Sequence, residues 1–223
     1  MSPDLPATVV ASREGLPSLT VCNRHARARV YLHGAHVASY RPVGEAEVLW
    51  MSIRSWYEPG KPIRGGIPLC FPWFGGHPTN AALPAHGFAR LRSFTLTRAE
   101  DLPDGRTQLA LALRASDETR ALWPHAFELV HTITVGPTLE LALEVRNVDQ
   151  RPFTFEEALH TYFDVADVRH TQVTGLEGAR CLDRIEGGER TEGRGPIGFA
   201  GETDRLYLGT PATCFIHDGP RIV

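Results

Sequence analysis

The stretch LELALEVR, residues 139–146, decides the fold class. Every second residue is apolar, and the residues between them are mostly charged. The apolar set is Leu139, Leu141, Leu143 and Val145. A period of two is typical of a β-strand with one face in a core and the other in water.

The same alternation recurs between residues 105 and 165. TQLALALR (107–114) and FELVHTITV (127–135) resemble the first stretch, and the turn sequences PDG (103–105) and GP (136–137) separate the runs. This spacing predicts antiparallel strands. Helical signals are scarce: SDETRALWP (116–124) has an N-cap candidate, early acids and a terminating proline, which predicts a short connector. The sequence therefore predicts an all-β antiparallel sandwich.

Length and composition indicate one domain spanning residues 1–223. The chain has 223 residues, of which 42% are hydrophobic, and no linker, repeat or low-complexity tract divides it. The net charge of -3, from 23 basic and 26 acidic side chains, gives no long-range positive field for nucleic acid or an anionic membrane. We expect a monomer whose anionic ligands are held by a few local arginines.

Cysteine usage and the N-terminal sequence predict a cytoplasmic protein. The four cysteines lie far apart without a C-x-x-C pair, and MSPDLPATVVASREG lacks the basic and apolar regions of an export signal. No window contains eighteen consecutive apolar residues, so the sequence predicts no membrane span.

The segment IRGGIPLCFPWFGGHP, residues 63–78, predicts an irregular loop. It contains four glycines, which allow conformations closed to other residues, and three prolines, which fix φ and lack a backbone donor. Such a loop would hold Arg64, Phe71, Trp73 and Phe74 towards a ligand.

The segment FTFEEALHTYF, residues 153–163, reads as a strand that places His160 beside polar groups. From this strand alone, a structural histidine satisfied by hydrogen bonds is favoured over a catalytic one. Glu156 would lie about 13 Å away along such a strand, which is too far for a direct partner. A base acting with His160 could still stand on another strand.

A third segment, PAHGFAR (84–90), places His86 and Arg90 around Gly87. Together with Arg64, Arg90 would supply two planar guanidinium groups for a phosphate, although loops of this kind are common without function. The sequence has no G-x-x-x-x-G-K-[ST] motif for that task. His33 and His36 have an odd spacing that sends them to opposite faces of a strand, so we expect no metal.

Seven motifs in order resemble one family. They are GAHVASY, EVLWMS, IRGGIPLCFPWFG, PAHGFAR, DETRALWPHAFEL, ALHTYFDV and TDRLYL, and they span about residues 34–208. Together they are similar to the hexose-6-phosphate mutarotases, also called glucose-6-phosphate 1-epimerases, which are relatives of aldose 1-epimerase. The resemblance implies a galactose mutarotase-like β-sandwich with a sugar groove on a concave sheet, acting without a cofactor.

The resemblance also implies roles for individual residues. His160 matches the acid that protonates the ring oxygen. The resemblance therefore favours a catalytic His160 over the structural histidine that the strand alone favoured. Arg64 and Arg90 match the arginines that bind the substrate phosphate, and Asp204 matches an aspartate that binds sugar hydroxyls. The chain has Ala85 where some members carry glutamine, so no role is assigned there. His86, Trp73 and Phe74 are expected to line the groove, with core packing an open alternative for Phe74.

One departure from the family concerns the base. The family uses a glutamate in a C-V-E segment beyond a W-N-P motif, and this sequence contains neither. Glu156, Glu157 and Glu177 do not occupy a position that the family uses. Two hypotheses follow: a mutarotase whose 223-residue form is incomplete at its C-terminus and exchanges anomers weakly or not at all, or a non-catalytic sugar-phosphate-binding module.

Overall fold

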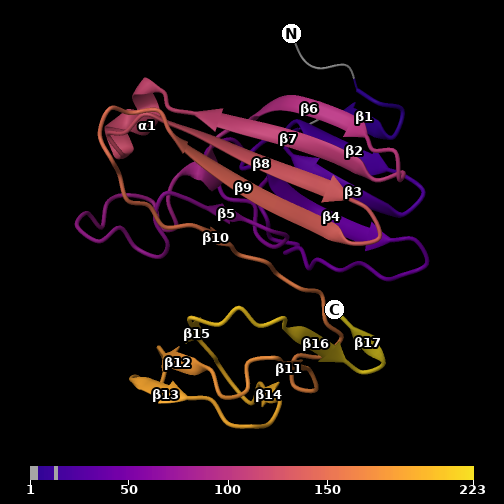
Figure 1. Ribbon diagram of the computed structural model, residues 1–223, viewed down its shortest axis with the longest axis vertical. Helices are drawn as coiled ribbons and strands as arrows, with labels where there is room; N and C mark the ends of the chain where they lie inside the picture. The colour runs from indigo at the N-terminus through magenta and orange to yellow at the C-terminus, as the bar shows by residue number, and fades with distance from the viewer. Residues whose placement is uncertain (1–4, 13–14) are drawn as a thin grey trace. The chain divides into compact units, whose positions relative to one another are not determined.

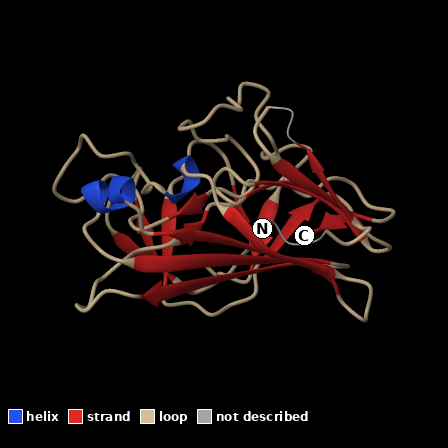
Figure 2. Ribbon diagram, turned by 90° about the horizontal axis from the view of Figure 1, so that it is seen from above, coloured by secondary structure: helices blue, strands red, loops and turns tan. Residues whose placement is uncertain are grey.

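A computed structural model describes residues 5–12 and 15–223 of the chain. It contains two compact units, Met1–Asp164 and Val165–Val223. This division does not test whether the chain is one domain, so that expectation stays a prediction. Figure 1 shows the strands of both units, and Figure 2 shows that helix is confined to short segments among strands and loops.

The first unit is built on two four-stranded antiparallel sheets, which confirms the predicted fold class. One sheet has the order β1-β2-β3-β4 and the other β6-β7-β8-β9. The first consists of β1 (Val9–Ser12), β2 (Ser18–Cys22), β3 (Ala26–Tyr31) and β4 (His36–Pro42). The second consists of β6 (Thr95–Asp101), β7 (Thr107–Arg114), β8 (Phe127–Val135) and β9 (Leu139–Asn147). In Figure 1 the second sheet is drawn across the first.

The core of this unit lies between the apolar faces of the two sheets. Val21 and Val30 of the first sheet, and Leu111, Leu129 and Ile133 of the second, are fully buried in one cluster. Burial of such side chains contributes roughly 1.5–3 kcal/mol each. The Tyr40 hydroxyl also donates a hydrogen bond across the core region to the Gly136 carbonyl (3.0 Å).

The sequence interpretation was correct for the long strands and the helix. β9 shows the expected alternation of half-buried and exposed residues. The helix α1 (Asp117–Leu122) begins after Ser116, whose hydroxyl accepts a hydrogen bond from the Thr119 N–H while Thr119 accepts one from the Ser116 N–H. This reciprocal arrangement satisfies two donors that a helix end otherwise leaves free. β7 is more buried than the pattern indicated, because Ala110 and Ala112, which alternate with the core-facing leucines, are buried as well.

Three shorter elements complete the first unit. β5 (Leu69–Cys70) pairs with β10 (Ala158–Leu159), and the 3-10 helix η1 spans Ala89–Leu91. These elements lie in or beside the segments that carry the candidate site residues. Within the described ranges, no helix is long and apolar enough to cross a membrane.

The second unit contains two small antiparallel sheets, of order β14-β11-β16-β17 and β13-β12-β15. Their strands are β11 (Gln172–Thr174), β12 (Arg180–Asp183), β13 (Glu189–Thr191), β14 (Ile197–Gly198), β15 (Arg205–Leu208), β16 (Phe215–Asp218) and β17 (Arg221–Ile222). Asp183, which is buried, pairs with Arg190 and Arg205 at 3.1 Å each. Because a buried carboxylate needs such partners, this cluster ties three strands of the unit together.

Candidate functional site

Three of the four glycines in the loop at residues 63–78 adopt the left-handed conformation that the sequence predicted for this segment. Gly65, Gly66 and Gly75 have positive φ, whereas Gly76 does not. A Cβ on Gly66 would lie 2.3 Å from the Val37 carbonyl oxygen. The Gly66 N–H donates to Trp50 O (2.8 Å), and the Gly66 carbonyl accepts from Tyr162 N–H (2.8 Å). Close backbone approach at Gly66 therefore joins two other segments of the site.

The segment 153–163 is mostly not a strand, so that prediction was wrong beyond Ala158–Leu159. Its backbone N–H groups still follow the 63–78 loop: Glu156 donates to Pro72 O (2.9 Å) and His160 to Pro68 O (3.0 Å). Proline has no N–H to return either bond. The two segments therefore run together without forming a regular ladder.

Glu156 links the segment 153–163 to the backbone of Phe74 by a hydrogen bond. Its carboxylate accepts a hydrogen bond from the Phe74 N–H (2.9 Å). The Phe74 ring then lies 4.9 Å from the His86 ring and 6.3 Å from the His160 ring, centroid to centroid. The Phe74 ring thus lies beside both imidazole groups, although Phe74 is not among the residues that line the pocket described next.

A pocket of about 510 Å³ lies between these segments. Its lining includes Trp50, Arg64, Pro68, His86, Arg90 and Tyr162. Three sequence-predicted residues, Arg64, His86 and Arg90, are therefore brought to one cavity. These residues are distant in the sequence, and close backbone approaches at glycines bring their segments together. One approach is at Gly66, described above, and another is at Gly87, where a Cβ would lie 2.0 Å from the Phe71 carbonyl oxygen.

The two arginines are held differently. Arg64 is exposed, and its guanidinium carbon lies 4.6 Å from the centroid of the Trp56 ring. Arg90 is half-buried and donates from Nη2 to the Ala85 carbonyl (2.8 Å), while its buried Nε has no hydrogen-bond partner within the described residues. Neither arginine forms an ion pair with a carboxylate there. Both guanidinium groups are thus available to an anion.

His86 has a defined orientation. Its backbone N–H donates to Gly75 O (2.6 Å), and its Nδ1 accepts from the Gly75 N–H (3.2 Å). Burial lowers the pKa of His86, and the charges of Arg90 and His160 lower it further. The neutral ring therefore carries its proton on Nε2, which can donate to a ligand hydroxyl.

His160 lies beside His86 and Tyr162. Its ring centroid is 5.9 Å from that of His86 and 4.9 Å from that of Tyr162. The side chain is half-buried, and it is not among the residues that line the pocket of about 510 Å³. Tyr162, Trp50 and Ser52 were not predicted as site residues. For Tyr162 a signal existed, because it shares the face of His160 in the sequence pattern.

Trp73 and Asp204 are not among the residues that line this pocket. Trp73 is 4% exposed, belongs to the core, and donates from Nε1 to the Pro84 carbonyl (3.0 Å). Trp73 therefore occupies a core position and not the expected place in the groove, and its ring centroid lies 5.9 Å from that of Phe88. Asp204 is in the second unit, where its backbone carbonyl accepts from Arg184 N–H (2.9 Å).

The described lining of this pocket contains no aspartate or glutamate. The residues described also include no group of three side chains suited to hold a metal ion. The pocket is thus cationic, and its lining combines two guanidinium groups with the His86 imidazole and the Tyr162 phenol. Such a site can bind an anion and transfer protons.

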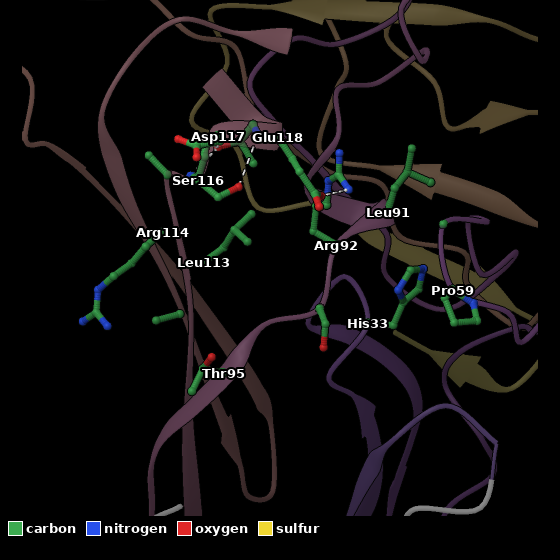
Figure 3. Close-up of a pocket in the computed structure, with 15 residues that line it drawn as sticks. His33, Pro59, Leu91, Arg92, Thr95, Leu113, Arg114, Ser116, Asp117 and Glu118 are labelled. Carbon is green, nitrogen blue, oxygen red and sulfur yellow. Dashed lines mark hydrogen bonds and ion pairs between the residues drawn. The ribbon is translucent and has the colours of Figure 1, made fainter. Parts of the chain in front are cut away.

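A larger pocket of about 800 Å³ contains none of the predicted residues. Figure 3 shows it between Arg92, Thr95 and α1. Arg92 pairs with Glu118 (2.7 Å), and Arg114 pairs with Glu128 (2.6 Å). Because carboxylates neutralise these arginines, this pocket is less suited to an anion.

The fold and the site together define a β-sandwich protein with a cationic, imidazole-containing ligand pocket. The chain belongs to the aldose 1-epimerase family, whose model matches residues 17–222. A Salmonella typhimurium protein named as a candidate glucose-6-phosphate 1-epimerase is 39% identical over 217 residues, covering 95% of this chain and 71% of that protein. A Cenchrus ciliaris protein of the same name is 37% identical over 222 residues, covering 95% and 67%.

A solved structure supports the same assignment. The crystal structure of a candidate mutarotase from Salmonella typhimurium superposes with a TM-score of 0.89 at 36% identity. The match covers 98% of this chain and 72% of that one. The resemblance drawn from the seven motifs is therefore confirmed.

Proposed function

We propose that this protein is an isomerase that interconverts the α and β anomers of a hexose 6-phosphate of the glucose 6-phosphate type. The observation that carries the proposal is one pocket lined by Arg64, Arg90 and His86, in which the His86 ring lies 5.9 Å from the His160 ring, centroid to centroid. The relatives named as glucose-6-phosphate 1-epimerases supply the substrate class. The two guanidinium groups would hold the phosphate, which fixes the position of the sugar ring.

Anomer exchange requires the ring to open and close again. An acid protonates the ring oxygen while a base removes the proton of the anomeric hydroxyl, and the free aldehyde then turns and recloses on its other face. In the proposal, His160 is the acid, because an imidazole can give and take a proton near neutral pH. The Nε2–H of neutral His86 donates to a sugar hydroxyl.

The reaction moves protons only, so it needs no oxidant, reductant or group donor. The four cysteines are free thiols. Free thiols are typical of the reducing cytoplasm, where we expect the protein to act on hexose phosphate as a monomer.

The direct test is anomeric exchange of glucose 6-phosphate followed by NMR, with and without the protein. The proposal predicts faster exchange with protein than without it. Saturable binding without faster exchange would contradict the enzymatic proposal and favour a sugar-phosphate-binding module.

A further inference from the structure

A second cationic surface lies outside the candidate site, on the outer face of the β1-β2-β3-β4 sheet. Along β3, the side chains of Ala26, Ala28 and Val30 are buried, and those of Arg27 and Arg29 are exposed between them. This alternation sends both guanidinium groups to the solvent face. They are two residues apart and therefore neighbours on that face.

The strands beside β3 do not neutralise this charge. Arg27 lies opposite Cys22 on one side and Arg41 on the other, and Arg29 lies opposite Thr20 and Ser39. These six positions contain three arginines and no carboxylate. Like charges directly opposite each other destabilise a sheet, so this arrangement has a cost that the sheet itself does not offset.

No ion pair to Arg27 or Arg29 exists within residues 5–12 and 15–223. The carboxylate of Glu47 hydrogen-bonds to the Ser39 hydroxyl (2.6 Å), but its other oxygen accepts from the backbone N–H of Tyr40 (2.8 Å). The outer face of the other sheet differs, since Arg114 and Arg146 there share Glu128. Although the chain has more acidic than basic residues, the part that the structure describes gives Arg27 and Arg29 no carboxylate partner.

These arginines line a pocket of about 460 Å³. Thr20, Ser39 and the Tyr31–Tyr57 pair, whose ring centroids are 5.3 Å apart, line the same pocket. Burial raises the pKa of the Tyr57 phenol, and the charge of Arg29 acts in the opposite direction, which shows that the two groups are neighbours. The pocket thus combines two guanidinium groups, several hydroxyls and an aromatic wall.

We propose that this pocket is a second binding site, for a small phosphate-bearing molecule. The Arg27 and Arg29 guanidinium groups bind the phosphate oxygens, because each offers paired N–H donors that fit them. The Thr20 hydroxyl adds a neutral hydrogen bond, while the Ser39 hydroxyl stays bonded to Glu47, and the Tyr31–Tyr57 pair contacts the organic part of the ligand. The site goes beyond the proposed function, since anomer exchange does not require it.

The two pockets are separate but share one loop. Trp50 and Ser52 line the candidate site, whereas Met51 and Tyr57 line the second pocket. Met51 also forms a bridge with Gly65, and the Ser52 N–H donates to Arg64 O (3.1 Å). A phosphate ligand can therefore occupy each pocket at the same time without sharing a side chain.

The test uses a protein whose first phosphate site is disabled. In an Arg64→Ala/Arg90→Ala background, titration of glucose 6-phosphate and of inorganic phosphate, followed by calorimetry and NMR, should show saturable binding that remains. Adding Arg27→Ala and Arg29→Ala should weaken that binding at least about tenfold, as the loss of charged hydrogen bonds predicts. Arg146→Ala, on the outer face of the other sheet, is the matched control and should leave it unchanged.

The outcomes separate the alternatives. Absence of saturable binding in the Arg64→Ala/Arg90→Ala background overturns the proposal. So does a loss of affinity with Arg146→Ala equal to that with Arg27→Ala and Arg29→Ala. Equal affinity for sulfate would overturn the assignment to a phosphate ligand. If the background protein does not fold, the otherwise native chain should bind two equivalents of glucose 6-phosphate, and Arg27→Ala/Arg29→Ala should bind one. These measurements do not use anomer exchange, so they stand apart from the test of the proposed function.

Discussion

Arg64 and Arg90 approach the candidate pocket from different segments, and both lack a carboxylate partner among the described residues. We predict that Arg64→Ala and Arg90→Ala each weaken glucose 6-phosphate binding by about 10- to 100-fold, the range for a charged hydrogen bond. Unphosphorylated glucose should lose much less, because each arginine would contact the phosphate alone. Calorimetry with both sugars measures the difference.

A matched control is Arg114→Ala, on β7, whose guanidinium pairs with Glu128 and lines the larger pocket. It should leave the affinity for both sugars unchanged. Equal losses for glucose and glucose 6-phosphate in the Arg64 and Arg90 variants would mean that these arginines contact the ring or support the fold.

His160 is predicted to act on the rate and not on binding. His160→Asn keeps a polar side chain of similar size and removes the titrating group. In a form of the protein that accelerates exchange, the rate of anomer exchange at saturating glucose 6-phosphate should fall by about 10² to 10⁴, the usual contribution of a positioned acid or base. The NMR exchange rate and the dissociation constant are both measured; an unchanged rate would reject the assigned role.

At the scale of elements, Gly66 joins the loop at 63–78 to its neighbours. Its φ is +60°, and an added Cβ would meet the Val37 carbonyl oxygen and the His36 side chain. We predict that Gly66→Ala lowers the free energy of unfolding by about 2 kcal/mol or more. Urea denaturation followed by tryptophan fluorescence measures it, because Trp50, Trp56, Trp73 and Trp123 all lie in the first unit.

The same loop supplies the control. Gly76 has no positive φ, and an added Cβ there meets nothing within 4 Å. Gly76→Ala should therefore change the free energy of unfolding by less than about 0.5 kcal/mol. Similar losses in the two variants would show that the strain is not specific to Gly66.

The sequence predicted elements whose structure depends on local pattern. β8, β9 and α1 were found because periodicity and capping residues are written in consecutive positions. The segment 153–163 alternates in the same way, yet most of it is not strand. The segment beside it is the 63–78 loop, whose Pro68 and Pro72 have no backbone N–H to donate to a ladder. The alternation within 153–163 does not indicate that this loop is the neighbouring segment.

The sequence predicted only part of the candidate site, because some of its residues are brought there by tertiary contacts. Arg64, Arg90 and His86 lie in motifs whose glycines and prolines indicate an unusual loop, and they meet in one pocket. Trp73 was misplaced because an aromatic side chain in a loop can face a ligand or the core, and the sequence does not distinguish the two. Trp50 and Tyr162 reach the pocket through backbone bonds to Gly66, a tertiary contact without a local signal.

For the first unit as a whole, stability should depend on a histidine that lies outside the candidate site. His131, on β8, is fully buried, and burial lowers its pKa from 6.5 to about 4, with the nearby backbone of Ala35 opposing this only in part. Between these values the unfolded chain binds a proton that the folded chain does not. The free energy of unfolding should therefore fall as the pH falls from 6.5 towards 4, by an amount on the order of 3 kcal/mol for this residue.

The comparison with His131→Leu isolates this contribution. Leucine fills a similar volume between Leu111 and Leu143, its cross-strand neighbours, and cannot bind a proton. Other buried groups titrate in both proteins, including His36, whose pKa burial lowers to about 3, so their effects cancel in the difference. Urea denaturation at several pH values, followed by tryptophan fluorescence, should give the variant a shallower loss of stability between pH 6.5 and 4. Parallel pH profiles for the two proteins would mean that His131 binds its proton equally well in the folded chain, which would contradict the effect assigned to its burial.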